Sequence, residues 1–230
     1  EFQAANLLAA LAACRAYGLS PDDIAHSLTQ FNSCNDNPGR ANLYKLNGGH
    51  VMLDYGHNPD AFEAICRMAA KWKDRSVTGI IAMPGDRDDS VIQHAGRVAA
   101  RGFDRVIVRE DHDTRGRQRG RVAQILRETV RRESPARSCE VVMDETEALR
   151  AAVKRMKKGE LVVVFYEKLE PLRALLEELS AEPALNIALE TGAAGLPPVS
   201  SDKFAQGRAY SDNPGSVACN ESGRAEHPSG

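Results

Sequence analysis

Short aliphatic runs alternate with amphipathic stretches through the middle of the chain. Two apolar segments flanking an Asn-Gly-Gly turn at 47–49 come first and predict a β-hairpin. Further aliphatic runs, typical of buried parallel strands, lie at 77–83, 105–110, 139–143 and 161–166. Stretches predicted as helices lie at 60–73, 89–101, 120–132, 145–157 and 170–180. Strands and helices at this spacing predict βαβ units with right-handed crossovers, and hence a Rossmann-like, doubly wound α/β fold with a mostly parallel sheet.

The first thirty residues predict two helices. Residues 3–17 are rich in Ala and Leu and are followed by Gly18, as in a buried helix with a glycine C-cap. Ser20 as N-cap and Pro21 at the first helical position favour a second helix. Because the chain starts with Glu1 rather than Met, and inside a predicted helix, we expect a fragment of a longer protein.

Two changes in composition divide the chain. Residues 32–40 are almost all turn formers and mark a predicted boundary or hinge. From about Ala181 the sequence loses its periodicity and fills with Gly, Pro, Ser and Asn. We therefore expect three parts: an N-terminal helical remnant at 1–35, the α/β domain at 36–180, and a disordered low-complexity tail at 181–230.

Composition excludes several classes of function. With 30 Lys plus Arg against 32 Asp plus Glu, the whole chain is no electrostatic partner for nucleic acid or an anionic membrane. The five cysteines are scattered and form no CxxC pair, which argues against a disulfide framework and a structural zinc site. There is neither a membrane-length apolar run nor a secretory signal. These features predict a cytoplasmic protein with no membrane partner and no metal site of its own.

Polar clusters follow four of the predicted strands. In an open parallel sheet, ligands bind beyond the carboxyl ends of the strands, because loops and helix N-termini converge there. We therefore expect a site at that edge. Its four segments are DYGHNP (54–59), PGDRDD (84–89), REDHDTRGRQRGR (109–121) and FYEKLEP (165–171).

Each cluster also has an ordinary structural interpretation. Asp54 and Asn58 could cap the helix that follows them, and an acid at 88–89 could cap the next helix with Arg87 merely solvated. The arginines of 115–121 could form a solvated loop or hold the phosphates of a nucleic acid. The nearly neutral net charge and the lack of interleaved aromatics count against a nucleic-acid partner.

Taken in order and at these spacings, the clusters resemble one family. The segment NPGRANLYKLNGGHVMLDYGHNPDAFEAI (37–65) is similar to the opening of the C-terminal domain of Mur ligases and folylpolyglutamate synthetases. The signature of that domain is a PGR turn followed by DYAH(N/T)P or DGAHNP. EDHDTRGR (110–117) and FYEKLEP (165–171) resemble the cyanophycin synthetase branch in particular. The resemblance covers roughly residues 1–180, and the first thirty match the last helices of the family's central ATPase domain.

The resemblance implies an ATP-dependent ligase that forms amide C–N bonds. Enzymes of this type convert a carboxylate into an acyl phosphate, which an incoming amine then attacks. In the cyanophycin branch the carboxylate is the β-carboxyl of a poly-aspartate backbone, and the amine is that of arginine. The implied partners are ATP with Mg²⁺, arginine, an aspartate-containing polymer and an upstream central ATPase domain. Family members also often self-associate, so a homo-oligomer is among the implied assemblies.

The sequence contains no GxxxxGK[ST] loop to hold phosphates. The family keeps that loop and its magnesium ligands in the central domain, which would precede Glu1. The isolated chain is therefore expected to be inactive as a ligase, and we assign it no catalytic residue. Domain closure about the hinge at 32–40 would complete the site. Two alternatives stay open: a Mur or folylpolyglutamate ligase with a different amino acid, and a degenerate domain that holds a polyanion.

The resemblance assigns four residues to the nucleotide. Arg40 matches the family arginine that reaches the nucleotide, and a guanidinium suits this task because it is permanently charged and pairs bidentately with phosphate. Asp54 matches the acid that accepts hydrogen bonds from ribose hydroxyls. His57 and Asn58 match neighbours that face the nucleotide, and Gly56 stands where the family usually has alanine.

The substrate side is assigned only as a set. Arginine as a substrate needs carboxylates for its guanidinium, and the acids on the expected edge are Asp86, Asp88, Glu110, Asp111, Asp113 and Glu167. Arg87 and Arg115 could instead hold the acidic polymer or the carboxylate of the amino acid. The cyanophycin pattern has Gly-Glu where this chain has Gly120 and Arg121. This charge reversal at a helix N-terminus is unfavourable with the helix dipole.

Overall fold

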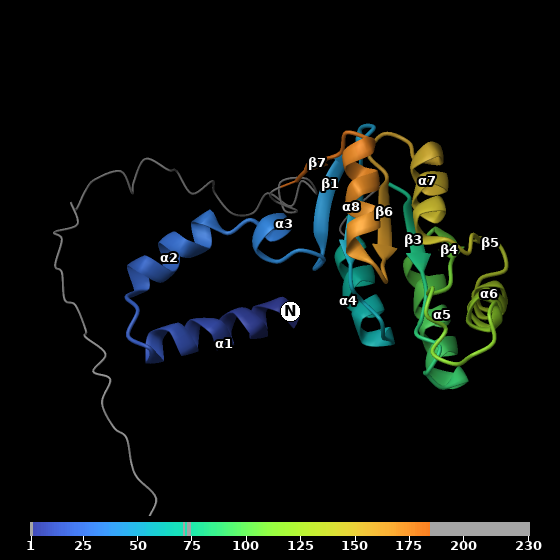
Figure 1. Cartoon of the computed structure of the whole chain (residues 1–230), viewed down its shortest axis with the longest axis horizontal. Helices are drawn as coiled ribbons and strands as arrows, with labels where there is room; N and C mark the ends of the chain where they lie inside the picture. The colour runs from blue at the N-terminus through green and yellow to red at the C-terminus, as the bar shows by residue number, and fades with distance from the viewer. Residues whose placement is uncertain (1, 71, 73–74, 185–230) are drawn as a thin grey trace, which may run out of the picture. The chain divides into compact units, whose positions relative to one another are not determined.

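The structure is a computed structural model, and it describes residues 2–70, 72 and 75–184 of the 230-residue chain. In this described part, one seven-stranded sheet has the order β5-β4-β3-β6-β2-β1-β7 (Figure 1). The strands are β1 (Asn42–Leu46), β2 (Gly49–Asp54), β3 (Val77–Ile81), β4 (Arg105–Val108), β5 (Ser138–Val141), β6 (Leu161–Phe165) and β7 (Glu182–Pro183). The helices are α1 (Phe2–Ala16), α2 (Pro21–Gln30), α3 (Ser33–Asp36), α4 (Pro59–Ala69), α5 (Asp89–Gly102), α6 (Arg121–Glu133), α7 (Glu145–Arg155) and α8 (Leu169–Glu178).

Neighbouring strands are parallel through most of this sheet. The pairs β2·β6, β6·β3, β3·β4 and β4·β5 are all parallel. Only β1, antiparallel to β2, and β7, antiparallel to β1, depart from this pattern. The predicted α/β fold with a mostly parallel sheet is therefore confirmed. Because β2, β3, β4 and β6 run in one direction, the four polar segments that follow them begin at the same edge.

Helices cover both faces of the sheet (Figure 1). On one face α4, α5 and α6 bury Phe62, Ile92 and Leu126 in a first apolar cluster. On the other face α7 and α8 bury Leu149 and Leu172 in a second cluster. Strands β3 and β6 are buried at every position, which explains why their sequences are continuous aliphatic runs rather than alternating ones. Among the described helices, none combines the length and the apolar character needed to cross a bilayer.

The predicted hairpin forms β1 and β2. Asn47 and Gly48 take positive φ values of 50° and 74°, as a two-residue hairpin turn requires. On its other side β1 pairs with β7, and the N–H of Ala184 donates to the carbonyl of Leu43 at 2.8 Å. Ordered pairing thus extends into the first residues of the segment expected to be a tail. The remainder of that segment, 185–230, lies outside the described residues.

The end of α1 and the start of α2 lie within one residue of their predicted positions. Gly18 follows α1 with a φ of 97°, and the hydroxyl of Ser20 caps α2 by accepting from the N–H of Asp23 at 3.1 Å. The predicted burial of α1 was wrong for the described residues, since Leu8 is 66% exposed. The reason is that α1 contacts α2 but is not enclosed by the elements that the structure describes.

Candidate functional site

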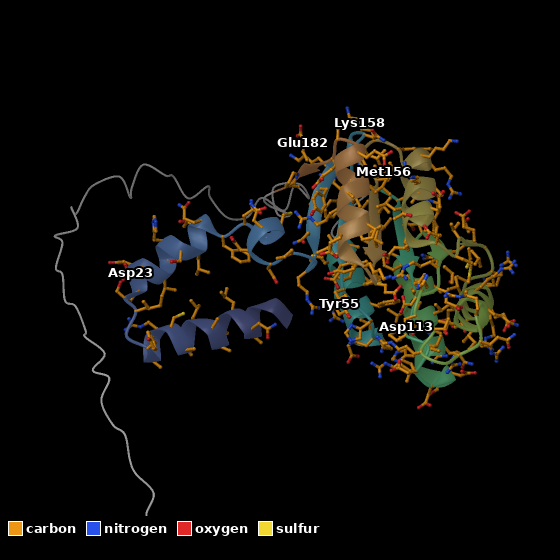
Figure 2. The ribbon with its side chains drawn as sticks, in the orientation of Figure 1. Asp23, Tyr55, Asp113, Met156, Lys158 and Glu182 are labelled. Carbon is orange, nitrogen blue, oxygen red and sulfur yellow. The ribbon has the colours of Figure 1, made fainter. Side chains whose placement is uncertain are left out.

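The segments that follow β2 and β4 both lie at the carboxyl edge of the sheet. Figure 2 shows Tyr55 and Asp113 at one edge and Met156 and Lys158 at the opposite edge. Strand β6 starts just after Lys158 and ends at Phe165, so the edge with Tyr55 and Asp113 is the carboxyl edge. The structure therefore places two of the predicted polar segments at the same edge, and the strand order places the other two, which follow β3 and β6, between them.

The predicted hinge, residues 32–40, is held as a defined loop in this structure. It contains the one-turn helix α3, and the side chain of Asn42 ties its ends together. The amide nitrogen of Asn42 donates to the carbonyls of Ser33 at 2.7 Å and Asn37 at 3.1 Å, and its oxygen accepts from the N–H of Gly39. Asn42 is 1% exposed, so water does not reach its side chain, and its amide itself supplies the hydrogen bonds that these backbone groups of the loop make there. Sequence reasoning missed this residue.

Gly39 contacts the end of β6. Its carbonyl accepts from the hydroxyl of Tyr166 at 3.1 Å and from the N–H of Tyr55 at 3.0 Å. Gly39 has a φ of 80°, and a Cβ at this position would collide with the Tyr166 hydroxyl. Both its conformation and its surroundings therefore require glycine. The turn delivers the next residue, Arg40, to the end of β2.

Arg40 and Asp54 lie together at that strand end. The guanidinium carbon of exposed Arg40 is 5.2 Å from the centroid of the Tyr55 ring, a cation–π contact. Asp54, the last residue of β2, is 8% exposed, and its carboxylate accepts from the N–H of Ala41 at 2.9 Å. Burial raises the pKa of Asp54, while backbone N–H groups and the charge of Arg40 oppose that rise. An exposed cation thus lies beside a carboxylate that has remaining capacity to accept hydrogen bonds.

His57 and Asn58 follow on the same segment. Nδ1 of His57 lies 3.0 Å from the carbonyl of Tyr55, which only accepts, so Nδ1 carries a proton and Nε2 is the acceptor of the neutral ring. Asn58 is the N-cap of α4 and accepts from the N–H of Ala61 at 2.8 Å. The helix-capping interpretation therefore holds for Asn58. The carboxylate of Asp54 instead accepts from the N–H of Ala41, in the turn before β1, and from that of Gly56.

Gly56 has a packing reason to replace alanine. Phe165 stacks on Phe62 with 3.9 Å between the ring centroids. A Cβ at position 56 would lie 2.8 Å from an atom of the Phe165 ring. The glycine therefore makes room for the aromatic pair under the strand end, and the departure from the family pattern leaves the polar groups around it in place.

Glu110 has a structural role that its assignment to substrate did not anticipate. It is 4% exposed, and its two carboxylate oxygens accept from the N–H groups of Gly120 at 2.8 Å and Ala123 at 3.1 Å. These are N–H groups of the first turn of α6, so Glu110 caps that helix from outside it. This accounts for the tolerated charge at Arg121, because the helix N-terminus receives its negative charge from Glu110.

Glu167 likewise shapes a loop. Its carboxylate accepts from the N–H groups of His112 at 2.6 Å and Asp113 at 3.2 Å. Asp113 in turn accepts from the N–H of Arg115 at 2.9 Å, within the same loop. The segments after β4 and β6 are thereby tied to each other, and both carboxylates of this pair take part in the loop structure.

Acids and arginines of the PGDRDD segment are more accessible. Arg115 donates to Asp86 at 3.1 Å, and this hydrogen bond holds the pKa of Asp86 below its ordinary value. Arg87 lies 3.9 Å from the other oxygen of Asp86. Asp88 occupies the N-cap position of α5 without a side-chain capping bond, and it is exposed. Of the acids assigned to substrate, Asp88 is therefore the one most available to a ligand in the described structure.

Arg109 is a buried residue of this edge that the sequence did not single out. It is 2% exposed and donates to the carbonyl of Phe165 at 2.6 Å and to Asp111 at 2.7 Å. It also pairs with Glu145 at 2.9 Å. Burial raises the pKa of Glu145, while the charge of Arg109 opposes the rise. One guanidinium thus joins the ends of β4 and β6 to the start of α7.

In the arginine-rich loop 115–121, Arg117 and Arg119 donate hydrogen bonds to backbone carbonyls of this protein. Arg117 donates to the carbonyls of Gly85 at 2.7 Å and Arg87 at 2.6 Å, and it pairs with Asp89. Arg119 donates to two loop carbonyls at 2.7 and 2.6 Å. These contacts occupy donors that the polyanion-binding alternative would need, and those of Arg117 fasten the loop to the segment after β3.

Metal-binding groups do not gather in the described residues. Within that part of the chain, no three His, Cys, Asp or Glu side chains are grouped as ligands for a metal ion. What the carboxyl edge does offer is an exposed guanidinium, a buried carboxylate and an imidazole on adjacent turns. This set of donors and acceptors suits phosphate and hydroxyl groups.

A family profile described as "Mur ligase, glutamate ligase domain" matches residues 39–165, from the glycine of the PGR turn to the last residue of β6. This chain belongs to the Mur ligase family. The match includes Arg40, Asp54, His57 and Asn58, so the part of the candidate site assigned to the nucleotide lies inside the matched range.

Known members of the family extend well beyond this chain. The cyanophycin synthetase of Crocosphaera subtropica is 40% identical over 167 residues, which are 72% of this chain and 19% of that protein. The UDP-N-acetylmuramoyl-L-alanyl-D-glutamate–2,6-diaminopimelate ligase of Aquifex aeolicus is 27% identical over 164 residues, 71% of this chain and 32% of the relative. The chain spans about a fifth of the length of the cyanophycin synthetases that it matches.

The fold of this Mur ligase domain also matches solved structures. The folylpolyglutamate synthase of Mycobacterium tuberculosis, complexed with ADP, superposes with a TM-score of 0.60 at 20% sequence identity. The match covers 80% of this chain and 41% of the synthase. At this identity the comparison supports the fold, and the arrangement of strands and helices agrees with the one predicted from the sequence.

Proposed function

We propose that this chain is the C-terminal part of an ATP-dependent amide ligase resembling cyanophycin synthetase. In this proposal the enzyme adds arginine to the β-carboxylate of a poly-aspartate backbone through an acyl phosphate. The observation that carries the proposal is the placement of Arg40 and Asp54 together at the end of β2, on the edge where an α/β sheet binds ligands. The 40% identity to a cyanophycin synthetase supports the choice of branch.

The residues at this strand end fit a nucleotide. The guanidinium of Arg40 would pair with phosphate oxygens, and its stacking on Tyr55 would limit the directions in which it points. Asp54 would accept hydrogen bonds from the ribose hydroxyls, because its carboxylate retains lone pairs beyond its bonds to the N–H groups of Ala41 and Gly56. ATP would supply the phosphoryl group that activates the substrate carboxylate. We expect the Mg²⁺ ligands to come mainly from the central domain.

The substrate groups divide into two kinds under this proposal. Glu110 and Glu167 hold backbone N–H groups and would keep the loops in shape rather than touch substrate. Asp88 is exposed and lacks a capping bond, so it is our first candidate for the guanidinium of the incoming arginine. Arg87 is the corresponding candidate for a carboxylate of the amino acid or polymer, since its nearest acid lies 3.9 Å away.

A chimera tests the function of the chain within a complete enzyme. Its matching segment replaces the corresponding segment of the Crocosphaera subtropica cyanophycin synthetase, which supplies the rest of the protein. We expect ADP release that requires both arginine and an aspartate-containing primer. A panel of amino acids in the same assay separates this function from that of a ligase with another amino acid. A folded chimera with no activity, or with a preference for a different amino acid, would contradict the proposal.

Variants of the same chimera test the site assignment. Arg40→Ala and Asp54→Ala should each lower the rate about 100-fold while the fold stays intact, because each removes a charged group that holds the nucleotide. The control is Arg132→Ala, which removes an exposed arginine of α6 and should leave the rate unchanged. Full activity in Arg40→Ala and Asp54→Ala would refute the assignment without affecting the proposed reaction.

A further inference from the structure

A hollow lies between the outer faces of α4 and α5, apart from the residues of the candidate site. Its volume is about 490 Å³. The lining residues recur every three or four positions, so they occupy one face of each helix. They are Glu63, Cys66, Arg67 and Ala70 on the α4 side, and His94, Arg97, Val98, Arg101 and Gly102 on the α5 side. We call this hollow the α4–α5 groove.

Basic side chains dominate the walls of the α4–α5 groove. Arg67 is 64% exposed, and its nearest acid is Glu63 at 3.6 Å. His94 shares the same acid at 3.8 Å. Arg101 is 71% exposed and pairs with a glutamate of α6 at 2.7 Å. Arg97 has no carboxylate at ion-pair distance in the part of the chain that the structure describes. The groove therefore carries excess positive charge on a chain whose net charge is −2.

We propose that the α4–α5 groove binds an extended acidic peptide. Arg97 and Arg101 are one helical turn apart, which separates them by about 6 Å along the helix axis. In an extended peptide every second side chain lies on the same face, so acidic side chains on one face repeat at about 7 Å. Two successive same-face carboxylates can therefore each meet a guanidinium: one meets Arg97, and the other meets the donors of Arg101 that its pair with Glu133 leaves free. Arg67 faces the peptide from the opposite wall.

The floor of the groove favours a peptide over a nucleic acid. Val98 is 9% exposed, and Cys66, which also lines the groove, is half-buried, so that desolvation raises the pKa of its thiol to about 12. An apolar floor between charged walls suits an extended backbone with alternating side chains. Single-stranded nucleic acid is held largely by stacking of its bases on aromatic rings, and the residues that line these walls include no Phe, Tyr or Trp.

Binding in the α4–α5 groove does not depend on the nucleotide site. The groove lies toward the ends of α4 and α5, and both helices begin at the carboxyl edge and run away from it. An acidic peptide held there would lie at a distance from Arg40 and Asp54. That such a peptide is a stretch of the aspartate polymer rests on the proposed function, whereas the binding itself does not.

Fluorescence anisotropy with a labelled ten-residue poly-aspartate peptide tests the proposal. It uses the complete 230-residue chain without nucleotide or arginine, so that its outcome is separate from ligase activity. We expect binding that weakens as salt rises, and a loss of about tenfold in Arg67→Glu/Arg97→Glu. The control, Arg127→Glu/Arg132→Glu, changes the net charge equally on α6 and should bind like the unmodified chain. Equal loss in both variants, or no binding at low salt, would overturn the proposal.

A second measurement locates the peptide without any substitution in the groove. A poly-aspartate peptide carrying a photoreactive diazirine should crosslink to residues 63–70 and 94–102, as mapped by mass spectrometry. Adducts elsewhere would overturn the proposal, and this holds even where the doubly substituted variant does not fold. Tighter binding of a single-stranded oligonucleotide with the same charge would also overturn it, because the site would then be selective for a polyanion of another class.

Discussion

Replacing Arg109 by methionine should destabilise the domain strongly. Its guanidinium is 2% exposed and makes close contacts with Asp111 at 2.7 Å, Glu145 at 2.9 Å and the carbonyl of Phe165 at 2.6 Å. Methionine fills much of the volume but leaves two carboxylates, each 13% exposed, without their cation. Breaking a buried pair in this way costs about 3 to 5 kcal/mol. For a domain of this size that corresponds to a fall in Tm of roughly 6 to 20 °C.

Urea unfolding followed by tryptophan fluorescence measures this loss. The chain has a single tryptophan, Trp72, which is 7% exposed and so reports on the folded core. The matched control is Arg150→Met, which breaks an ion pair whose side chains are 43% and 59% exposed. It should leave the midpoint nearly unchanged, because exposed pairs contribute little.

A double variant decides whether the uncompensated charge is the cause. In Arg109→Met/Glu145→Gln, an amide oxygen replaces the carboxylate and can still accept from the N–H of Glu167, which is 2.7 Å away in the structure. The double variant should therefore be more stable than Arg109→Met alone. Additive losses, or a small effect of Arg109→Met, would refute the electrostatic explanation.

The pH dependence supplies an independent check on the same variant. Without Arg109, the pKa of Glu145 should rise further above its ordinary 4.5, because the charge that opposes the effect of burial is gone. A carboxyl whose folded-state pKa is raised contributes stability below the unfolded pKa and loses it as pH rises through the folded pKa. The stability gap between Arg109→Met and the unmodified chain should thus narrow as pH falls toward 4.5. A constant gap would contradict this.

Three further predictions concern the loops. Glu110→Gln should cost about 2 kcal/mol in urea unfolding, because the start of α6 loses a charged acceptor; no loss would contradict its capping role. Gly39→Ala should destabilise by about 1 to 3 kcal/mol through its positive φ, and adding Tyr166→Phe should recover part of the loss by removing the hydroxyl that the new Cβ meets. Arg115→Ala should move the pKa of Asp86 upward in an NMR titration and so weaken the loss of stability below about pH 4, whereas an unchanged value would disprove the pairing.

Much of the fold follows from local patterns. Strands such as β6 are continuous aliphatic runs because helices cover both faces of the sheet, and that signal is visible in the sequence alone. Helix starts such as Ser20 and Asn58 are also visible, because a cap bonds to the backbone only three residues onward. The edge that carries Arg40 and Asp54 could also be predicted, because the direction of parallel strands fixes the edge at which their carboxyl ends lie.

The missed residues have partners that are distant in the sequence. Arg109 bonds to the carbonyl of a residue 56 positions away. A charged residue at the end of a strand is expected to be exposed to solvent, whereas Arg109 is only 2% exposed. Glu110 was assigned to substrate because the sequence shows that it is an acid. The sequence does not show that its carboxylate accepts from two N–H groups 10 and 13 positions later. Asn42 lies inside a predicted strand, where an amide gives no hint that it ties the preceding loop.

The short strand β7 determines how far the chain must extend for the edge of this sheet to resist aggregation. Without Glu182–Pro183 and the bond from Ala184, the outer side of β1 would present a row of unpaired backbone groups. Such a row is a template for strand addition between molecules and hence for aggregation. Proline at position 183 also lacks an N–H, so it discourages further strands from adding beyond β7. A protein shortened at residue 180 should therefore be prone to precipitate, and one that continues through Ala184 should not.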